Sequence, residues 1–311
     1  MAKNPLTDKR ISLAMANKEI EAASADMTAI YKNARMRIND RIRTHFSSYG
    51  KDPLTGKHLT TLLSTLEEEY IELEEHLRER FDMAIPYVAQ GNFLAALHDT
   101  RSSVVGKIDK SRIELMVRDA FTHVAGATQN MQKSDVQFLR QISSEVFREA
   151  SMTGETRQEV SNRLLGKILS RPEKFTFTDA GGRSWSNDAY VSMLSRTVLH
   201  NVGRETYFDT CIQKGKDVVR VSVSGDSCPM CEVWENRLLS ITGETEGLPT
   251  VAEAESAGLF HPNCTHSLVA VGSAEQHRSF DEAGRPKRGI NAKGNEKALP
   301  KKKATTPNLK K

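Results

Sequence analysis

Apolar residues recur with helical spacing along the first half of the chain. Between residues 30 and 46 they return every four positions, which places them on one stripe of a helix. Between residues 63 and 77 they alternate steps of three and four, the spacing of a coiled-coil seam. Capping-box sequences at residues 134–137 and 156–159 predict the starts of two later helices, and Pro172 ends the series. We therefore expect this half to be helical.

Two clusters of charge accompany these apolar stripes. The first helix carries basic residues at positions 32, 35, 37, 41 and 43. The 63–77 segment carries carboxylates, and they are Glu67, Glu68, Glu69, Glu72, Glu74 and Glu75. Both clusters are interpreted as solvated helix faces, with phosphate binding as the alternative for the basic one.

The pattern changes after Pro172. Residues 175–185 alternate around a glycine-containing turn and predict a small hairpin. Ser186 can cap a helix that runs to about Lys214 and is closed by Gly215. Alternating valines from 219 to 223 then predict a half-buried strand.

Three of the four cysteines and two of the nine histidines lie within 39 residues. Cys228 and Cys231 form a CxxC knuckle, and His261, Cys264 and His266 follow after 29 intervening residues. Thiolates and imidazoles are the ligands of structural zinc, which takes four of them in a tetrahedron. We therefore predict a structural zinc ion held by the three cysteines and one histidine. The HxxC spacing favours His261, whereas an extended 264–266 segment would favour His266, so the fourth ligand stays open.

Other chemistries explain these residues less well. A thioredoxin-like redox pair would leave the distant histidines without a role, and no βαβ pattern surrounds the CxxC. A zinc deaminase would need a glutamate two residues after His261. Reduced, buried cysteines would not explain the clustering, although that interpretation suits the isolated Cys211. A zinc-dependent hydrolase with Asp226 or Glu232 as general base is kept as an alternative.

The C-terminal end of the chain differs in composition from the rest. Residues 285–311 contain ten basic residues and one acidic residue, a net charge of +9 within a total of +4, which leaves −5 for residues 1–284. With prolines, glycines and few large apolar side chains, this tail is expected to be disordered. It either solubilises the protein or contacts nucleic acid or an acidic partner. The candidate nucleic-acid-binding residues are Lys287, Arg288, Lys301, Lys302 and Lys303.

Several classes of protein are not indicated. No stretch approaches the roughly 18 apolar residues of a membrane-spanning helix, and the first residues lack a secretory apolar region. Four cysteines are too few for a disulfide framework, so we expect a reducing compartment and no membrane contact. The sequence thus predicts an α+β fold that is mostly α. Its expected parts are a helical domain (1–172), a small zinc-stabilised α+β domain (173–273) and a disordered basic tail (274–311).

Motifs between residues 175 and 270 carry a family resemblance. They include Phe-Thr-Asp at 177–179, Ser-Arg-Thr at 195–197, Cys-Pro-Met-Cys-Glu at 228–232 and Gly-Leu-Phe-His-Pro-Asn-Cys-Thr-His at 258–266. This region resembles the C-terminal part of phage minor capsid proteins of the type-2 group. It is more distantly similar to the portal-associated head-morphogenesis family.

The resemblance implies a virion component without catalytic activity. It implies a place in the phage head, at the portal vertex or the capsid interior, after assembly in the host cytoplasm. The implied partners are the portal protein and the major capsid protein, with scaffolding protein, packaged DNA and further copies of the chain as additional candidates. A DNA-binding head protein that acts through its basic tail is the alternative. The broader family often has cysteine at the position of His266, which favours His266 as the fourth ligand, whereas Thr265 replaces the usual arginine.

Overall fold

The structure is a computed structural model. It describes residues 5–49, 56–101, 108–153, 155–170, 176–178, 184–224, 228–272 and 279–286. The chain divides into two compact units. The first consists of Met1–Gly91 and Ile108–Gly203, and the second of Asn92–Lys107 and Arg204–Lys311. The domain boundary expected at residues 172/173 falls inside the first unit and stays a prediction, since a compact unit and a domain need not share their limits.

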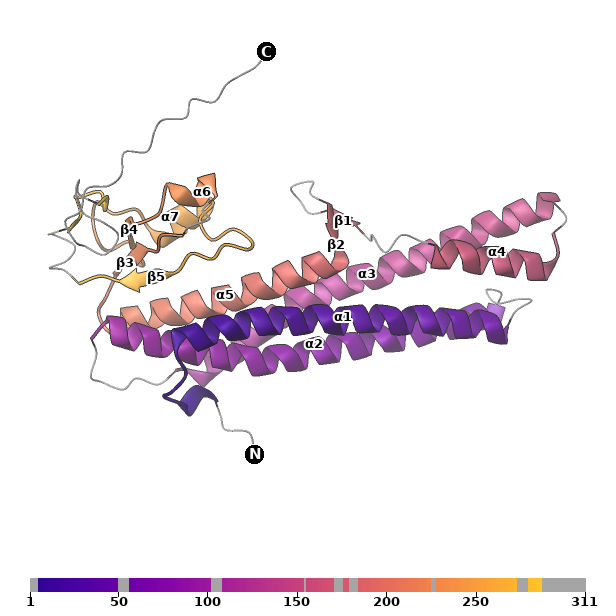
Figure 1. The fold of residues 1–311 in the computed structure, drawn as a ribbon, viewed down its shortest axis with the longest axis horizontal. Helices are drawn as coiled ribbons and strands as arrows, with labels where there is room; N and C mark the ends of the chain where they lie inside the picture. Colours follow the sequence, from indigo (N-terminus) through magenta and orange to yellow (C-terminus); the bar gives the residue numbers. More distant parts are fainter. Residues whose placement is uncertain are drawn as a thin grey trace, which may run out of the picture. The chain divides into compact units, whose positions relative to one another are not determined.

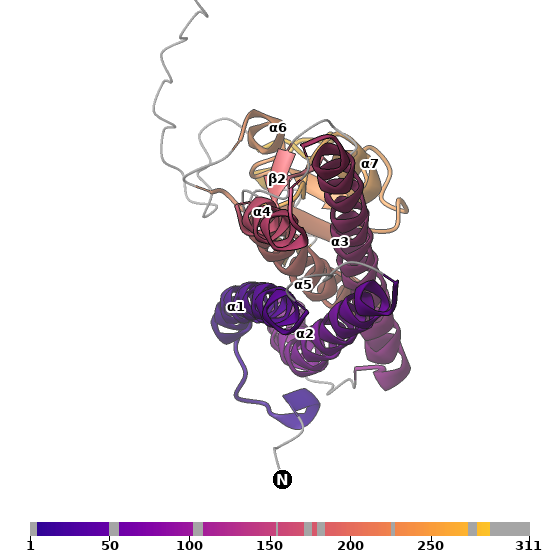
Figure 2. The ribbon, with the colours of Figure 1, turned by 90° about the vertical axis from the view of Figure 1, so that its right-hand side faces the viewer.

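Helices make up most of the first unit (Figure 1). They are η1 (Pro5–Thr7), α1 (Leu13–Ser48), α2 (Gly56–Asp99), α3 (Lys110–Thr153), α4 (Arg157–Leu169) and α5 (Asn187–Gln213). The last residues of α2 and of α5 belong to the second unit. Figures 1 and 2 both show α1 and α2 running side by side.

The predicted apolar stripes form the core of this unit. On α1, Ala34, Ile38, Ile42 and Phe46 are buried. On α2, the 66–77 part of the seam is buried as well, and both stripes belong to one hydrophobic cluster. Periodicity therefore identified the buried faces, because a stripe of apolar side chains is stable only against another such stripe.

One predicted helix start is wrong and the other is confirmed. α3 continues through residues 134–137, where we expected a capping box. Asp135 instead lies buried and accepts hydrogen bonds from Arg35 and Tyr70, so its carboxylate joins helices and does not cap one. Thr156 does cap α4, with a complete capping box.

The charged clusters on α1 and α2 pair with each other. Arg37 Nε lies 2.7 Å from Glu69 Oε2, and Arg41 Nε lies 3.0 Å from Glu69 Oε1. Glu69 is only 3% exposed, so the prediction of a wholly solvated acidic face is wrong at this residue. Burial raises the pKa of Glu69, but the hydrogen bonds from Arg37 and Arg41 outweigh it and hold that pKa below its ordinary value. Two arginines of the basic face are therefore already paired.

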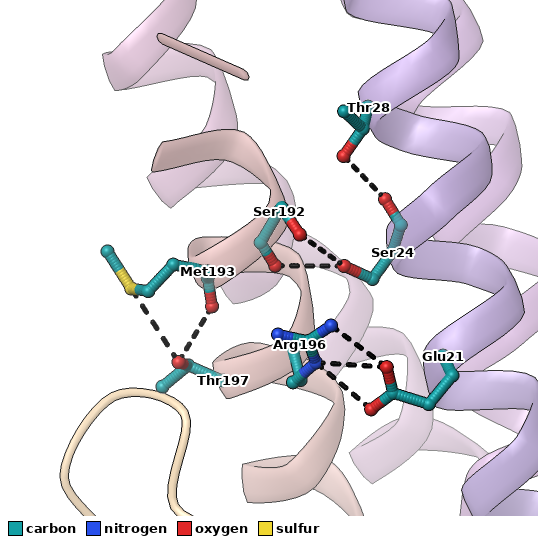
Figure 3. A network of polar contacts seen from close by, with 7 residues as sticks. All are labelled: Glu21, Ser24, Thr28, Ser192, Met193, Arg196 and Thr197. Atoms are coloured by element: carbon teal, nitrogen blue, oxygen red, sulfur yellow. Dashed lines mark hydrogen bonds and ion pairs between the residues drawn. The ribbon is translucent and has the colours of Figure 1, made fainter. Parts of the chain in front are cut away.

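Polar contacts join α1 to α5 (Figure 3). The Ser24 hydroxyl donates to the carbonyl oxygen of Ser192 at 2.9 Å. The guanidinium of Arg196 grips the Glu21 carboxylate through Nε and Nη2, at 3.0 Å and 2.9 Å. A bidentate pair of this kind fixes orientation, so the motif at 195–197 has a structural role in helix packing.

The expected hairpin is present and belongs to the first unit. β1 (Thr176–Thr178) and β2 (Ser184–Ser186) pair antiparallel, with Phe177 opposite Trp185. The glycine turn between them lies outside the described residues. Ser186 Oγ then accepts from the backbone N–H of Ala189, which supports the predicted cap of α5.

The second unit contains a small antiparallel sheet. β3 (Val218–Val221) lies between β4 (Leu238–Ser240) and β5 (Leu268–Ala270). Two short helices, α6 (Pro229–Glu232) and α7 (Val251–Ser256), complete it. The predicted class, mostly α with a small C-terminal sheet, is confirmed.

The end of α5 packs with the sheet. Tyr207 and Cys211 share a buried cluster with Val219 of β3. The Tyr207 hydroxyl donates to Asp99 Oδ2 at 2.6 Å and accepts from the backbone N–H of Ala270 at 2.8 Å. This hydroxyl thereby ties the last turn of α2 to β5 within the second unit.

The folded part of the second unit extends beyond the expected start of the tail at residue 274. Residues 279–286 form a turn whose Phe280 is 4% exposed and packs with Val218 and Leu238. The backbone N–H of Leu238 also donates to the carbonyl of Gly284 at 2.8 Å. The buried Phe280 ring and this backbone hydrogen bond together hold the segment beside β3 and β4.

Candidate metal centre

Two short turns present the predicted ligands. In the first, the backbone N–H groups of Cys231 and Glu232 donate to the carbonyl of Cys228 at 3.0 Å and 2.9 Å. In the second, the backbone N–H of Cys264 donates to the carbonyl of His261 at 2.9 Å. The CxxC and HxxC spacings therefore each close a short backbone turn, although the first is the start of α6 and the second contains Asn263 at a positive φ.

The turns bring all five predicted donors together around Cys231. One group consists of Cys228, Cys231 and His261, the other of Cys231, Cys264 and His266, and within each group the ligand atoms lie within 4.8 Å of one another. Segments separated by 29 residues thus meet at one sulfur.

In the second group, two donor distances are close to those between ligands of one tetrahedral ion. Zinc at about 2.3 Å from sulfur and about 2.0–2.1 Å from nitrogen requires S–S edges of about 3.8 Å and S–N edges of about 3.6 Å. The Cys231 and Cys264 sulfurs lie 3.7 Å apart, and Cys264 Sγ lies 3.3 Å from His266 Nδ1. A donor set of thiols and imidazoles at these separations fits zinc.

The two histidines differ in their second contact. His261 places Nε2 3.1 Å from Cys228 Sγ and Nδ1 2.8 Å from the carbonyl oxygen of Pro262. His266 places Nδ1 toward Cys264 and Nε2 3.1 Å from Glu235 Oε1. The buried ring of His266 therefore contacts a carboxylate, and the partly exposed ring of His261 contacts a backbone carbonyl.

The thiols respond to their surroundings in opposite directions. The backbone N–H of Cys231 lowers the pKa of the Cys228 thiol to about 7. Burial raises the pKa of the Cys231 thiol, and the neighbouring sulfurs of Cys228 and Cys264 raise it further. Several thiolates close together need a compensating cation, and a divalent ion bound there would supply that charge.

Two residues with left-handed backbone lie beside His261, and no sequence pattern indicated them. Phe260 and Asn263 have φ angles of 61° and 64°, in the left-handed region, which asparagine adopts readily and a bulky residue such as phenylalanine avoids. The guanidinium of Arg204 lies 4.1 Å from the centre of the Phe260 ring, a cation–π contact that holds this turn. Burial lowers the pKa of Arg204.

The other residues singled out in the sequence lie outside the two donor groups or outside the described residues. Glu232 is exposed on α6, and Asp226 lies outside the described residues. Cys211 is fully buried in α5, and burial raises its pKa to about 12, as suits a packed thiol. The tail residues proposed for nucleic acid, Lys287, Arg288, Lys301, Lys302 and Lys303, also lie outside the described part of the chain.

Comparison with known proteins identifies the family. Among the described residues, no helix has the length and apolar character needed to cross a membrane. No curated protein and no solved structure matches the chain significantly. A family of phage proteins does match, and it covers residues 15–274, including the helical half for which the motifs gave little indication. The chain therefore belongs to the phage minor capsid protein 2 family.

Proposed function

We propose that this chain is a structural component of a phage head whose second unit is clipped by a zinc ion and docks on the portal protein or the major capsid protein. The observation that carries the metal part is the meeting of five thiol and imidazole donors at Cys231. Membership of a minor capsid family supports the place in the virion. The role is structural and not catalytic.

The number of donors favours a closed site. Catalytic zinc keeps three protein ligands and an open position, whereas structural zinc is enclosed by four. Each donor group offers three ligands and the two groups share Cys231, so one further ligand from the other group would close the site. The sheet beside them has strands of only three or four residues. A unit with so small a core gains much of its stability from a metal clip.

Metal analysis tests the clip. Purified under reducing conditions, the protein should contain about one zinc per chain, measured by inductively coupled plasma mass spectrometry. Cys231→Ser should abolish binding, because Cys231 belongs to both donor groups. Cys211→Ser is the matched control and should retain zinc, since Cys211 lies outside both groups. A wild-type protein without stoichiometric zinc would remove the clip from the proposal.

The docking part rests on apolar side chains beside the first turn. Met230 and Val233 are 52% and 61% exposed, and they flank Cys231 on α6 and at its end. A metal-fixed turn can hold two such side chains in a constant geometry, which suits a contact with another subunit of the head. We infer that this tip meets the portal or the major capsid protein.

Co-expression with these two proteins tests the docking. Met230→Asp combined with Val233→Asp should reduce recovery of the chain with portal or capsid assemblies by at least about tenfold, the effect of losing about 1.4 kcal/mol of binding free energy. Ile212→Asp, which changes another exposed apolar residue of the same unit, should leave recovery unchanged. Equal recovery of the double variant and the wild type would refute this surface.

The positive charge of residues 285–311 supports a second candidate function, contact with packaged DNA. DNA binding driven by phosphate contacts should fall steeply between about 50 and 200 mM salt. Removal of residues 287–311 should abolish the salt-sensitive binding. The tail is favoured over the basic face of α1, because the arginines at 37 and 41 of α1 are already paired with Glu69. DNA binding that survives the truncation would show that the tail is not the contact.

A further inference from the structure

We propose that His266 is the fourth zinc ligand, through Nδ1, and that Glu235 is the residue that positions it. This inference rests on the zinc clip proposed above and goes further by choosing between the two histidines. It also assigns a role to Glu235, for which no sequence motif gave a signal.

The first step is the orientation of the His266 ring. Its Nε2 lies 3.1 Å from Glu235 Oε1, and because a carboxylate oxygen accepts, Nε2 is placed to donate to it, which leaves Nδ1 as the nitrogen that would bind a metal. Nδ1 points to the Cys264 sulfur at 3.3 Å. A carboxylate that binds the far nitrogen of a metal-ligating histidine fixes its tautomer and raises its basicity as a ligand.

The second step is burial. The side chains of His266 and Glu235 are 4% and 15% exposed, so the pair is shielded from water. A charged carboxylate in such a place needs partners that donate to it. Glu235 Oε1 also accepts a hydrogen bond from the backbone N–H of Ser224 at 2.8 Å. The same oxygen therefore contacts both the segment that follows β3 and the His266 ring.

The third step is the connection to the sheet. Ser222 and Ser267 continue the pairing of β3 with β5, since Ser222 N–H donates to the Ser267 carbonyl at 2.8 Å and Ser267 N–H donates to Ser222 Oγ at 2.9 Å. His266 therefore lies where two strands are already joined. Zinc bound to its Nδ1 would fasten the cysteine turns to the edge of the sheet.

His261 is positioned less firmly than His266. Its ring is partly exposed, and its nitrogens face the Cys228 sulfur and the backbone carbonyl of Pro262. The Nε2–Sγ distance of 3.1 Å and the 3.3 Å between His266 Nδ1 and Cys264 Sγ are both somewhat shorter than the S–N edge of about 3.6 Å, so the second contact of each ring and its burial, and not these distances, distinguish the two histidines. A backbone carbonyl is a neutral acceptor, whereas the Glu235 carboxylate forms the stronger, charge-assisted hydrogen bond with His266, which is also the buried ring, so His266 is the more firmly positioned ligand.

Nitrogen NMR of the full-length protein, labelled with ¹⁵N-histidine and loaded with zinc, identifies the ligand directly. His266→Gln and His261→Gln assign the two rings. We expect the metal-bound signal to be Nδ1 of His266, with a protonated Nε2. A metal-bound Nε2 of His261, with His266 free, would overturn the inference and leave the zinc clip intact.

Zinc affinity, measured by competition with a chromophoric chelator, tests the positioning role. Glu235→Ala should weaken zinc binding by about 10–100-fold, the usual effect of losing an outer partner of a ligand. Glu235→Gln keeps an acceptor oxygen and should weaken it less. Glu232→Ala removes an exposed carboxylate from the neighbouring turn and should have no effect.

The two proposals fail in distinguishable ways. Zinc affinity that is unchanged in Glu235→Ala, in a variant with wild-type circular dichroism, overturns the role of Glu235 alone. A wild-type chain that binds no zinc overturns the clip itself, and with it the choice between the histidines.

Discussion

Asp217 shows how one side chain can organise a loop. Its carboxylate accepts hydrogen bonds from the hydroxyl of Ser240 at 2.6 Å and from the backbone N–H and hydroxyl of Thr242, both at 2.7 Å. Thr245 donates to the same group. Burial raises the pKa of Asp217, but these hydrogen bonds outweigh it and lower the pKa to about 2. The charged form is therefore the one that the loop after β4 requires.

Asp217→Asn should destabilise the second unit at neutral pH by about 1–2 kcal/mol, because the amide replaces an acceptor with a donor and removes the charge. The ordinary pKa of aspartate is about 3.9 and the folded value is lower. The contribution of the carboxylate is therefore complete above about pH 4 and is lost as the pH falls toward 2. Urea unfolding at several pH values measures it.

Glu244→Gln is the control for this substitution, since Glu244 is an exposed carboxylate of the same loop. Its unfolding curve should match that of the wild type at every pH. The interpretation of Asp217 would be wrong if the difference between Asp217→Asn and the wild type were as large at pH 2 as at pH 7.

The sequence could predict ligands but not their supports. Cys228, Cys231 and Cys264 are recognisable because thiols at knuckle spacing have few other uses. Glu235 and Arg204 are ordinary charged residues in the sequence, and only the folded chain places them against His266 and the Phe260 ring. Asp217 is hidden for the same reason, since its four donors follow it by more than twenty residues.

At the scale of helices, Gly91 permits a close approach between α2 and the start of α1. A Cβ atom at Gly91 would lie 2.5 Å from the Ala16 Cβ and 3.0 Å from the carbonyl oxygen of Ser12. Neither neighbour can yield easily, because one is a short side chain and the other is backbone. The glycine is therefore required by packing, although glycine weakens a helix.

Gly91→Ala should destabilise the helical unit by about 1–2 kcal/mol, since an overpacking cost of about 1–3 kcal/mol exceeds the gain in helix propensity. Gly126→Ala, in the interior of α3, is the matched control, because nothing lies within 4 Å of its added Cβ. It should stabilise the helix by about 0.5–1 kcal/mol. Thermal unfolding followed by far-ultraviolet circular dichroism compares them, and equal shifts for both variants would contradict the packing argument.

The helices show which local sequence patterns predict the structure correctly and which do not. The apolar stripes of α1 and α2 were predictable because burial is their main source of stability. The capping box expected at residues 134–137 failed because a short motif has a second use: Asp135 meets Arg35 and Tyr70 from other helices. The capping box at Thr156 succeeded at a place where the chain does turn into a new helix.

For the whole molecule, the two units should differ in their dependence on metal. The helical unit has a large buried cluster made of side chains from long helices. The second unit has a smaller cluster in which Cys231 and Cys264 themselves take part. Removal of the ion would therefore leave buried thiols without their ligand bonds in the second unit only.

A chelator should unfold the second unit and spare the helices. The chain has two tryptophans, so Trp185→Phe leaves Trp234, which is 9% exposed in the second unit, as the reporter. We expect a strong zinc chelator to shift its emission to the red with little loss of helical circular dichroism, and added zinc to reverse the shift. Zinc at about 1,000 times its dissociation constant would contribute about 4 kcal/mol. Emission that stays unchanged after measured zinc removal would mean that the unit folds without the ion.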